Sequence, residues 1–292
     1  MNRTIPESEL FINADGSVCH LHIRPDQLAH KIILVGDPGR VPTVASHFDH
    51  IECEVQNREF RTITGAYRGK RISVVSTGIG GDNIDIVMNE LDALANIDFA
   101  TRQPRETAQS LELVRIGTCG GLQPEVSLGS HICSVKSIGL DGVIYFYAKH
   151  RQVRETGLEE ALLRHLAWDA TLNPVRPYAV DADAGLAARI AGTDMVQGIT
   201  MSANGFYGPQ GRLLRLERTN PELNARIESF AYKGLHVTNY EMEGAALAGM
   251  ARMLGHKAVT CCMVLANRLE KTANFQYLDG MENLITKVLD RI

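Results

Sequence analysis

Apolar and β-branched residues gather in short continuous runs along the whole chain. A strand with one face in water alternates apolar and polar side chains, whereas a strand covered on both faces is apolar throughout. The runs therefore predict strands of a sheet that is buried on both sides. They are Lys31–Val35, Arg71–Ser76, Leu111–Ile116, His131–Ile138, Gln197–Ser202, His236–Tyr240 and Ala258–Leu265.

Segments with helical character lie between many of these runs. Asp82–Ile97 carries apolar residues close to helical spacing, and Met242–Leu254 is rich in Ala, Leu and Met. Gly255 follows the second segment as a C-cap, and Met281–Ile292 is amphipathic. Strands that alternate with helices predict an α/β fold in which the sheet is covered on both faces.

Two further segments refine this picture. A hairpin over Phe60–Ser76, turning near Arg68-Gly69-Lys70, predicts that the sheet is mixed. The polar stretch Asp98–Ser110 contains two arginines and Pro104, and we expect it to form an exposed loop. Because no repeat, low-complexity tract or linker interrupts the pattern, we expect a single domain over residues 1–292.

Composition narrows the classes of function. A net charge of −4 argues against a nucleic-acid partner, although a few local arginines suffice for a phosphate site. Met1–Leu10 has no apolar core of a signal peptide, and no apolar run approaches the ~20 residues of a membrane helix. We therefore expect a cytoplasmic protein without a membrane partner. The six cysteines form no C-x-x-C pair, so a zinc or thioredoxin motif is unsupported.

Two strand ends carry glycines beside an arginine. Gly36-Asp37-Pro38-Gly39-Arg40 follows one predicted strand, and Arg115-Ile116-Gly117-Thr118-Cys119-Gly120-Gly121 stands at the end of another. Such junctions let an oxyanion approach backbone N–H groups, and ligands bind outside the carboxyl ends of strands in α/β sheets. Each segment alone is also compatible with an ordinary tight turn. Together they favour a phosphate site.

Two carboxylates stand where the last long apolar helix is expected to begin. In Tyr240-Glu241-Met242-Glu243-Gly244 either of them could cap the helix, since negative charge is favourable at a helix N-terminus. Glu243 precedes a wholly apolar helix, which makes a surface position less favourable. A carboxylate there can accept hydrogen bonds from the vicinal hydroxyls of a ribose.

A glycine-rich segment after another strand offers groups that match uracil. Gln210 provides an amide donor and an acceptor, and Arg212 provides donors only. Uracil presents acceptor, donor and acceptor along O2, N3–H and O4, and Phe206 could pack against a sugar or base face. The alternative is a surface loop with a solvated arginine.

Taken together, these segments resemble the nucleoside phosphorylase I family, and within it the uridine phosphorylase subgroup. The matching segments are Gly36-Asp37-Pro38 with Arg40, Arg58-Glu59-Phe60, Ser76-Thr77-Gly78-Ile79-Gly80-Gly81, Arg115-Ile116-Gly117-Thr118, Phe206-Tyr207 with Gln210 and Arg212, Asn239-Tyr240-Glu241-Met242-Glu243, and Asn267-Arg268. The resemblance implies a single-domain, three-layer α/β sandwich around a mixed, barrel-like sheet. It also implies a homodimer or larger homo-oligomer with shared active sites.

The resemblance further implies a role for each matching residue. Phosphate would be bound by Gly36, Arg40, Arg115, Thr118 and, from a neighbouring subunit, Arg58. The ribose would be held by Met242, Glu243 and the neighbour's His20. The base would be read by Phe206, Gln210, Arg212 and Arg268. Arg212, Glu243 and Arg115 would carry the catalysis.

Three departures from the family pattern affect these expectations. Cys19 precedes His20 where relatives often carry an aromatic residue. Asn83 replaces the serine found in uridine phosphorylases that bind an interface potassium ion, so that ion is uncertain here. The stretch Asp98–Ser110 is longer than in compact members, which leaves dimer against hexamer open.

The implied reaction is phosphorolysis of uridine, with deoxyuridine or thymidine as further substrates, in pyrimidine salvage or catabolism. Inorganic phosphate is the co-substrate, and no cofactor or metal is expected. A purine phosphorylase or nucleosidase is the alternative within the family, but those enzymes usually carry an aspartate in a Ser-Asp pair after the equivalent late strand, which here ends Ala266-Asn267-Arg268 with no acid. A non-catalytic nucleoside-binding protein and a dinucleotide-dependent oxidoreductase are less favoured, because the phosphate arginines are present and no G-x-G-x-x-G follows the first strand.

Overall fold

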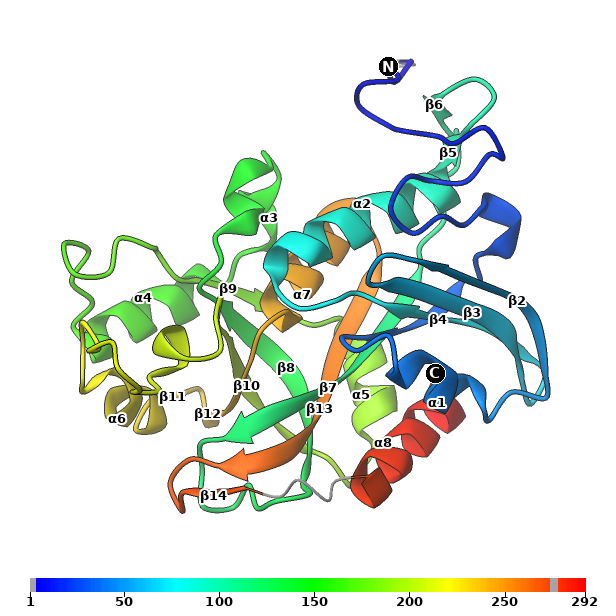
Figure 1. Cartoon of the computed structure of the whole chain (residues 1–292). Coiled ribbons are helices and arrows are strands. Elements are labelled where there is room, and N and C mark those ends of the chain that lie inside the picture. The colour runs from blue at the N-terminus through cyan, green and yellow to red at the C-terminus, as the bar shows by residue number, and fades with distance from the viewer. Residues whose placement is uncertain (1–3, 274–277) are drawn as a thin grey trace.

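The computed structural model describes residues 4–273 and 278–292. Within them, a twelve-stranded mixed sheet runs through the molecule (Figure 1). Its strands are β1 (Lys31–Val35), β2 (His50–Asn57), β3 (Phe60–Tyr67), β4 (Lys70–Ser76), β7 (Glu112–Gly121), β8 (His131–Gly139), β9 (Tyr178–Asp181), β10 (Val196–Ser202), β11 (Ala231–Tyr232), β12 (Leu235–Glu241), β13 (Lys257–Asn267) and β14 (Thr272–Ala273).

One half of this sheet closes on itself. Strands β12, β10, β8, β13 and β7 are hydrogen-bonded in that order, and β12 then pairs back onto β7 through Asn239 with Gly121 and Tyr240 with Gly120. From β7 the sheet continues as an open part through β1, β4, β3 and β2. The hairpin of β3 and β4 is antiparallel, whereas β1 is parallel to both β4 and β7. The predicted mixed, barrel-like sheet is confirmed.

Helices cover both faces of the sheet. They are α1 (Arg40–Ala45), α2 (Gly81–Asn96), α3 (His150–Val153), α4 (Thr156–Leu166), α5 (Ala184–Ala191), α6 (Leu223–Glu228), α7 (Gly244–Leu254) and α8 (Leu278–Arg291), with short 3₁₀ turns at Pro25–Gln27, Val143–Phe146 and Gly208–Gln210. None of the helices in this described part of the chain is long and apolar enough to cross a membrane.

Strand β1 shows why its sequence is apolar throughout. Ile32 and Leu34 pack into a core with α2 and α7, whereas Ile33 and Val35 pack into a second core with α1, α5 and α8. Every side chain after Lys31 is therefore buried, on alternate faces. The three predicted helices correspond to α2, α7 and α8, and Gly255 ends α7 in the left-handed conformation at φ 85°.

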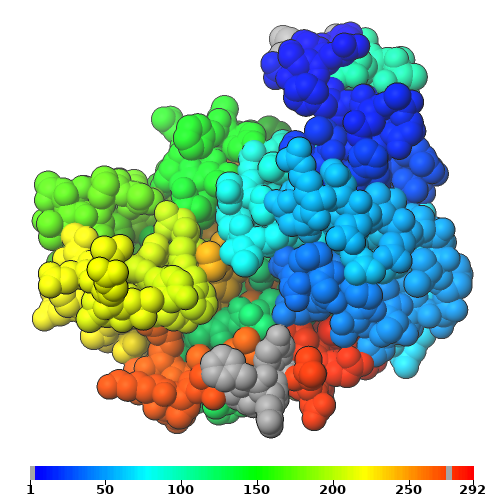
Figure 2. All heavy atoms as spheres, viewed as in Figure 1, coloured from blue at the N-terminus to red at the C-terminus, as the bar shows by residue number. Residues whose placement is uncertain are grey.

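The expectation of a plain loop over Asp98–Ser110 is wrong in part. Its beginning forms a small antiparallel hairpin of β5 (Ile97–Asp98) and β6 (Gln103–Pro104). Between these strands, Arg102 donates hydrogen bonds to backbone carbonyls of the N-terminal segment, including Ile5 and Pro6. The hairpin and this segment project together from the body of the molecule (Figure 2). The partners of Arg102 lie more than ninety positions away in sequence, so no local pattern announces them.

Candidate active site

A cavity of about 900 Å³ opens beside the carboxyl ends of β1, β4, β10 and β12 and along the second half of β7. This volume is within the range of small-molecule sites. The predicted site residues on its wall are Gly36, Arg40, Arg115, Thr118, Phe206, Gln210, Arg212, Met242 and Glu243. Further lining residues, which sequence reasoning did not assign to a ligand, include Asp37, Glu59, Ile79, Asn83, Glu241 and Leu265.

The turn after β1 is stabilised by a local hydrogen bond and also lines the cavity. The Asp37 carboxylate accepts a hydrogen bond from Gly39 N at 2.8 Å, which is an ordinary Asx turn. Arg40, at the start of α1, donates from Nη1 to the carbonyl of Ile116 at 3.3 Å. The segment is therefore an ordinary turn that also lines the cavity, and its role in phosphate binding stays a prediction.

The prediction that a strand ends at Ile116 is wrong. The pairing with β1 stops where Val35 meets Ile116, but β7 continues to Gly121 along β13 and β12. The segment Gly117–Gly120 is thus extended strand beyond the end of its neighbour β1. A Cβ on Gly117 would lie 2.3 Å from Arg115 Nη1, so glycine is needed here to make room for the guanidinium.

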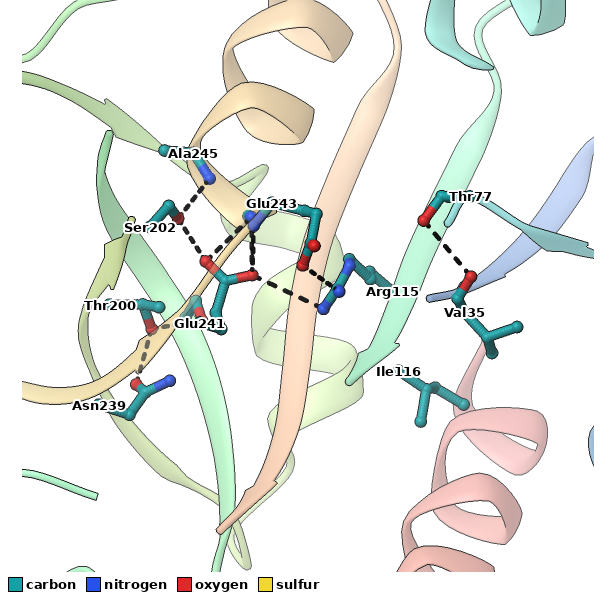
Figure 3. A network of polar contacts seen from close by, with 12 residues as sticks. Val35, Thr77, Arg115, Ile116, Thr200, Ser202, Asn239, Glu241, Glu243 and Ala245 are labelled. Carbon is teal, nitrogen blue, oxygen red and sulfur yellow. Dashed lines mark hydrogen bonds and ion pairs between the residues drawn. The ribbon is translucent and has the colours of Figure 1, made fainter. Parts of the chain in front are cut away.

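Arg115 is buried between two carboxylates (Figure 3). Its Nη2 donates to Glu243, and its Nη1 lies 3.6 Å from Glu241 Oε2. Burial alone would lower its pKa, but the charges of Glu243 and Glu241 outweigh burial and raise the pKa of Arg115. Its Nε and Nη1 have no hydrogen-bond partner among the described residues, although both are buried. A buried, charged group with free donors on a cavity wall is suited to bind an anion.

The two carboxylates before α7 have different surroundings. Glu241 accepts hydrogen bonds from Glu243 N at 2.9 Å and from Gly244 N at 2.8 Å, so it caps the helix. Glu243 instead accepts from Gly80 N at 2.7 Å and from Arg115. Burial raises the pKa of Glu243 although Arg115 opposes that shift. Capping is thus done by Glu241, which leaves Glu243 beside the cavity.

The segment after β10 places three side chains on the cavity wall. Gln210 is buried, and its Oε1 accepts a hydrogen bond from Arg212 Nη1 at 2.6 Å. The Arg212 guanidinium carbon lies 3.8 Å from the centre of the Phe206 ring. Burial, helped by the nearby charge of Arg268, lowers the pKa of Arg212 to about 10. Arg212 therefore stays protonated at neutral pH.

Arg268 lies next to this part of the wall. Its guanidinium carbon is 5.7 Å from the centre of the Tyr240 ring, and a Cβ on Gly120 would come within 3.3 Å of its Cδ. Asn267, which stands before it, is buried and donates to the carbonyl of Val126 at 3.1 Å. Asn267 therefore holds the backbone beside Arg268.

His20 and Arg58 do not line the cavity of the chain that carries them, as the structure describes it. Arg58 is exposed at the turn between β2 and β3, with φ 54°. His20 Nδ1 lies 2.7 Å from Glu90 Oε1, and Asn57 Nδ2 donates to the carbonyl of His20 at 2.9 Å. Asn57 thus ties the His20 segment to the residue beside Arg58, so the two predicted donors lie on one edge of the molecule.

Cys119 faces the cavity but is not suited to act as a nucleophile. Burial and the neighbouring Cys262 raise the pKa of its thiol well above the ordinary range, so the thiol is protonated at neutral pH. Within the described ranges, no group of three or more His, Cys, Asp or Glu side chains is placed to hold a metal ion.

Comparison with known proteins identifies several relatives of this chain. Uridine phosphorylase of Thermococcus kodakarensis is 31% identical over 273 residues, covering 89% of this chain and 83% of that protein. Uridine phosphorylase of Escherichia coli is 28% identical and covers 87% of each chain. Among solved structures, a Trypanosoma brucei nucleoside phosphorylase described as showing uridine phosphorylase activity superposes with a TM-score of 0.87. It is 29% identical and covers 97% of this chain and 98% of its own.

The family relationship extends over nearly all of the sheet and its helices. Residues 30–290 match the family described as the phosphorylase superfamily, a range that contains every cavity-lining residue named above. With this match and the relative at 31% identity, the chain belongs to the phosphorylase superfamily.

Proposed function

We propose that this chain catalyses the phosphorolysis of a pyrimidine nucleoside, with uridine as the expected substrate, to give uracil and ribose 1-phosphate. One observation carries the proposal. A single cavity wall holds two arginines, a buried carboxylate beside one of them, and a glutamine paired with a third arginine. These are the groups needed for phosphate, ribose and uracil. The uridine phosphorylase names of several relatives support the same reaction.

The proposed roles follow the order of groups along β7. Near Arg115, phosphate would be bound by Gly36, Arg40, Arg115 and Thr118, with Arg58 of a neighbouring subunit. In the middle, the ribose would contact Met242 and Glu243, with the neighbour's His20. Near Gly120, the base would meet Phe206, Gln210, Arg212 and Arg268. From Arg115 to Gly120 an extended strand spans roughly 16 Å, which is long enough for both substrates.

The chemistry is substitution at C1′ of the ribose. Phosphate forms the new C1′–O bond while the C1′–N1 bond to uracil breaks, through a transition state with oxocarbenium character. A phosphate fixed by arginines is both the nucleophile and the counter-charge to this cation. Uracil leaves as an anion, and Arg212, still protonated at neutral pH, donates to a carbonyl oxygen as charge builds there. No cofactor takes part in this scheme.

We expect uridine cleavage to depend on inorganic phosphate. The two buried carboxylates on the cavity wall are already engaged, because Glu241 caps α7 and Glu243 pairs with Arg115. The test is release of uracil and ribose 1-phosphate from uridine, deoxyuridine, thymidine, cytidine and inosine, with and without phosphate. Equal rates of base release in phosphate-free buffer would indicate a hydrolase, and faster cleavage of inosine would indicate a purine enzyme.

Arg212→Ala should lower kcat/KM for uridine by about ten- to a hundredfold, since a hydrogen bond from a charged group contributes ~1.5–3 kcal/mol. Part of the loss should be in kcat, because Arg212 also meets the charge of the leaving group. Affinity for phosphate should stay the same. Cytidine should be a poor substrate of the wild type, as its amine meets donors. Unchanged turnover of uridine by Arg212→Ala would contradict the assigned role.

We further propose that the working unit is a homodimer or larger homo-oligomer that serves pyrimidine salvage or catabolism in the cytoplasm. The exposed Arg58 and the His20 segment held beside it support a site completed between subunits.

A further inference from the structure

The Glu241 carboxylate is fully engaged by this chain. It accepts from Ser202 Oγ, from Glu243 N at 2.9 Å, and through both oxygens from Gly244 N at 2.8 and 3.0 Å. Its side chain is 1% exposed. Three donors of this chain thus occupy both carboxylate oxygens, and Arg115 Nη1 lies 3.6 Å from Oε2 as an ion pair. Glu241 is therefore held through both oxygens by its own chain, although it borders the cavity.

Ser202 extends this arrangement into the neighbouring strand. Glu241 and Ser202 are register partners in the parallel pair of β12 and β10. While Ser202 donates to Glu241, its oxygen accepts from Ala245 N at 2.9 Å, so the hydroxyl is oriented (Figure 3). The first turn of α7, the end of β10 and Arg115 thus all meet at one buried charge.

From these contacts we propose that Glu241 is a positioning residue for the reaction. Glu241 fixes the first turn of α7, from which Glu243 faces the ribose region, and it lies beside Nη1 of Arg115 while Glu243 holds Nη2. Arg115 then keeps its place when a ligand draws Glu243 away. The inference rests on the proposed function, in which Arg115 meets phosphate and Glu243 meets ribose.

The substitution Glu241→Gln distinguishes a positioning role of Glu241 from an effect of its negative charge alone. Loss of one negative charge beside Arg115 would by itself favour phosphate binding. However, the amide must place its NH₂ either where Oε1 faces Ser202 Oγ and Gly244 N, or where Oε2 faces Glu243 N, Gly244 N and Arg115. Since all of these are donors, one side is left as donor against donor. Positioning predicts that this mismatch outweighs the gain in charge.

The expected result is a ten- to hundredfold loss, about that of one charged hydrogen bond, both in kcat and in affinity for inorganic phosphate. Uracil, measured as a competitive inhibitor, should bind as before, because the base region does not contact Glu241. The loss should be equal for uridine and 2′-deoxyuridine, since Glu241 does not touch the 2′-hydroxyl. Ser202→Ala should change kcat and phosphate affinity in the same direction by a smaller factor.

Glu159→Gln is the matched control. Glu159 is also a buried glutamate that pairs with an arginine, Arg154, and accepts from a backbone N–H, that of Ala179 at 3.0 Å. It lies outside the cavity wall. Its replacement should lower the melting temperature and leave phosphate affinity and kcat per folded enzyme unchanged.

If Glu241→Gln binds phosphate more tightly and kcat is unchanged, the positioning role is wrong, and Glu241 acts only through its negative charge. A larger loss on uridine than on 2′-deoxyuridine would overturn it in favour of direct contact with ribose. If Glu241→Gln does not fold, Ser202→Ala decides, and wild-type kinetics and phosphate affinity in that variant would overturn the proposal. If the wild type cleaves no nucleoside yet binds phosphate, the proposed function fails while the comparison of phosphate affinities still tests Glu241.

Discussion

Arg115→Met should abolish nearly all activity and destabilise the fold by about 3–5 kcal/mol, the usual cost of leaving a buried charge unpaired. Arg115 is the buried cation that faces both Glu241 and Glu243. Without it, two buried carboxylates remain together without their shared cation. The same change removes the proposed phosphate donor, so kcat and phosphate affinity should both fall.

The pH dependence of this destabilisation gives a second readout. Burial already raises the pKa of Glu243, and loss of Arg115 removes the charge that opposes this shift. A carboxyl whose pKa is higher in the folded than in the unfolded state binds more protons when folded. The fold is therefore most stable while this carboxyl is protonated. The free energy of unfolding falls as the pH rises above the pKa that the carboxyl has in the unfolded chain. The free energy of unfolding of Arg115→Met should thus fall relative to wild type between about pH 5 and 8.

The double variant Arg115→Met/Glu243→Gln provides the control for this experiment. It removes one of the two stranded charges and should regain part of the stability, most clearly at high pH, without regaining activity. Denaturant unfolding followed at several pH values measures these differences. A single variant with wild-type stability and phosphate affinity would show that Arg115 carries neither role.

Arg58→Ala should fold normally and yet retain only about one to ten per cent of wild-type kcat/KM, as expected for loss of one charged hydrogen bond. Arg58 is exposed and lies apart from the cavity of its own chain. Mixing this variant with a Gln210→Ala/Arg212→Ala chain should restore activity. Random pairing makes about half of the dimers mixed, each with one intact site, so roughly a quarter of wild-type activity is expected.

The control mixture replaces the second chain by Arg58→Ala/Gln210→Ala/Arg212→Ala. Neither chain then supplies Arg58 and only half of the chains carry an intact base region, so activity per total protein should be about half that of the Arg58→Ala variant. Subunit exchange is followed with differently tagged chains. If exchange is complete and the first mixture is no more active than the control, each site is built within one chain and the shared-site proposal is wrong.

Features that depend on neighbouring residues could be predicted from the sequence. Strand β1 is apolar at each position after Lys31 because both faces meet helices, and the segment that became α7 ends at Gly255, where the backbone is left-handed. The hairpin of β3 and β4 was predicted on the same basis, from two strand-like runs joined by a turn that contains Gly69. In the structure, Gly69 has a φ of 76°. In each case, the residues that set the hydrophobic period and the turn lie within a few positions of one another in the sequence.

Other features were decided only by contacts between distant parts of the chain. The local pattern left open which of Glu241 and Glu243 caps the helix, although the resemblance singled out Glu243 for the ribose. Their contacts depend on donors from Ser202, Gly80 and Arg115. The continuation of β7 past Ile116 likewise depends on pairing with β12 and β13, more than a hundred residues away.

Gly117 illustrates the physical reason for this limit. A glycine after a strand indicates a turn or space for a ligand, but in this structure the guanidinium of Arg115 occupies the space beside Gly117. Arg115 is held there by charges from the end of β12 and the start of α7, which are brought close only when the sheet closes. Local sequence determines which elements form, because hydrophobic period and backbone conformation act over a few residues. The charge arrangement of the site depends on distances across the closed sheet, which no local pattern contains.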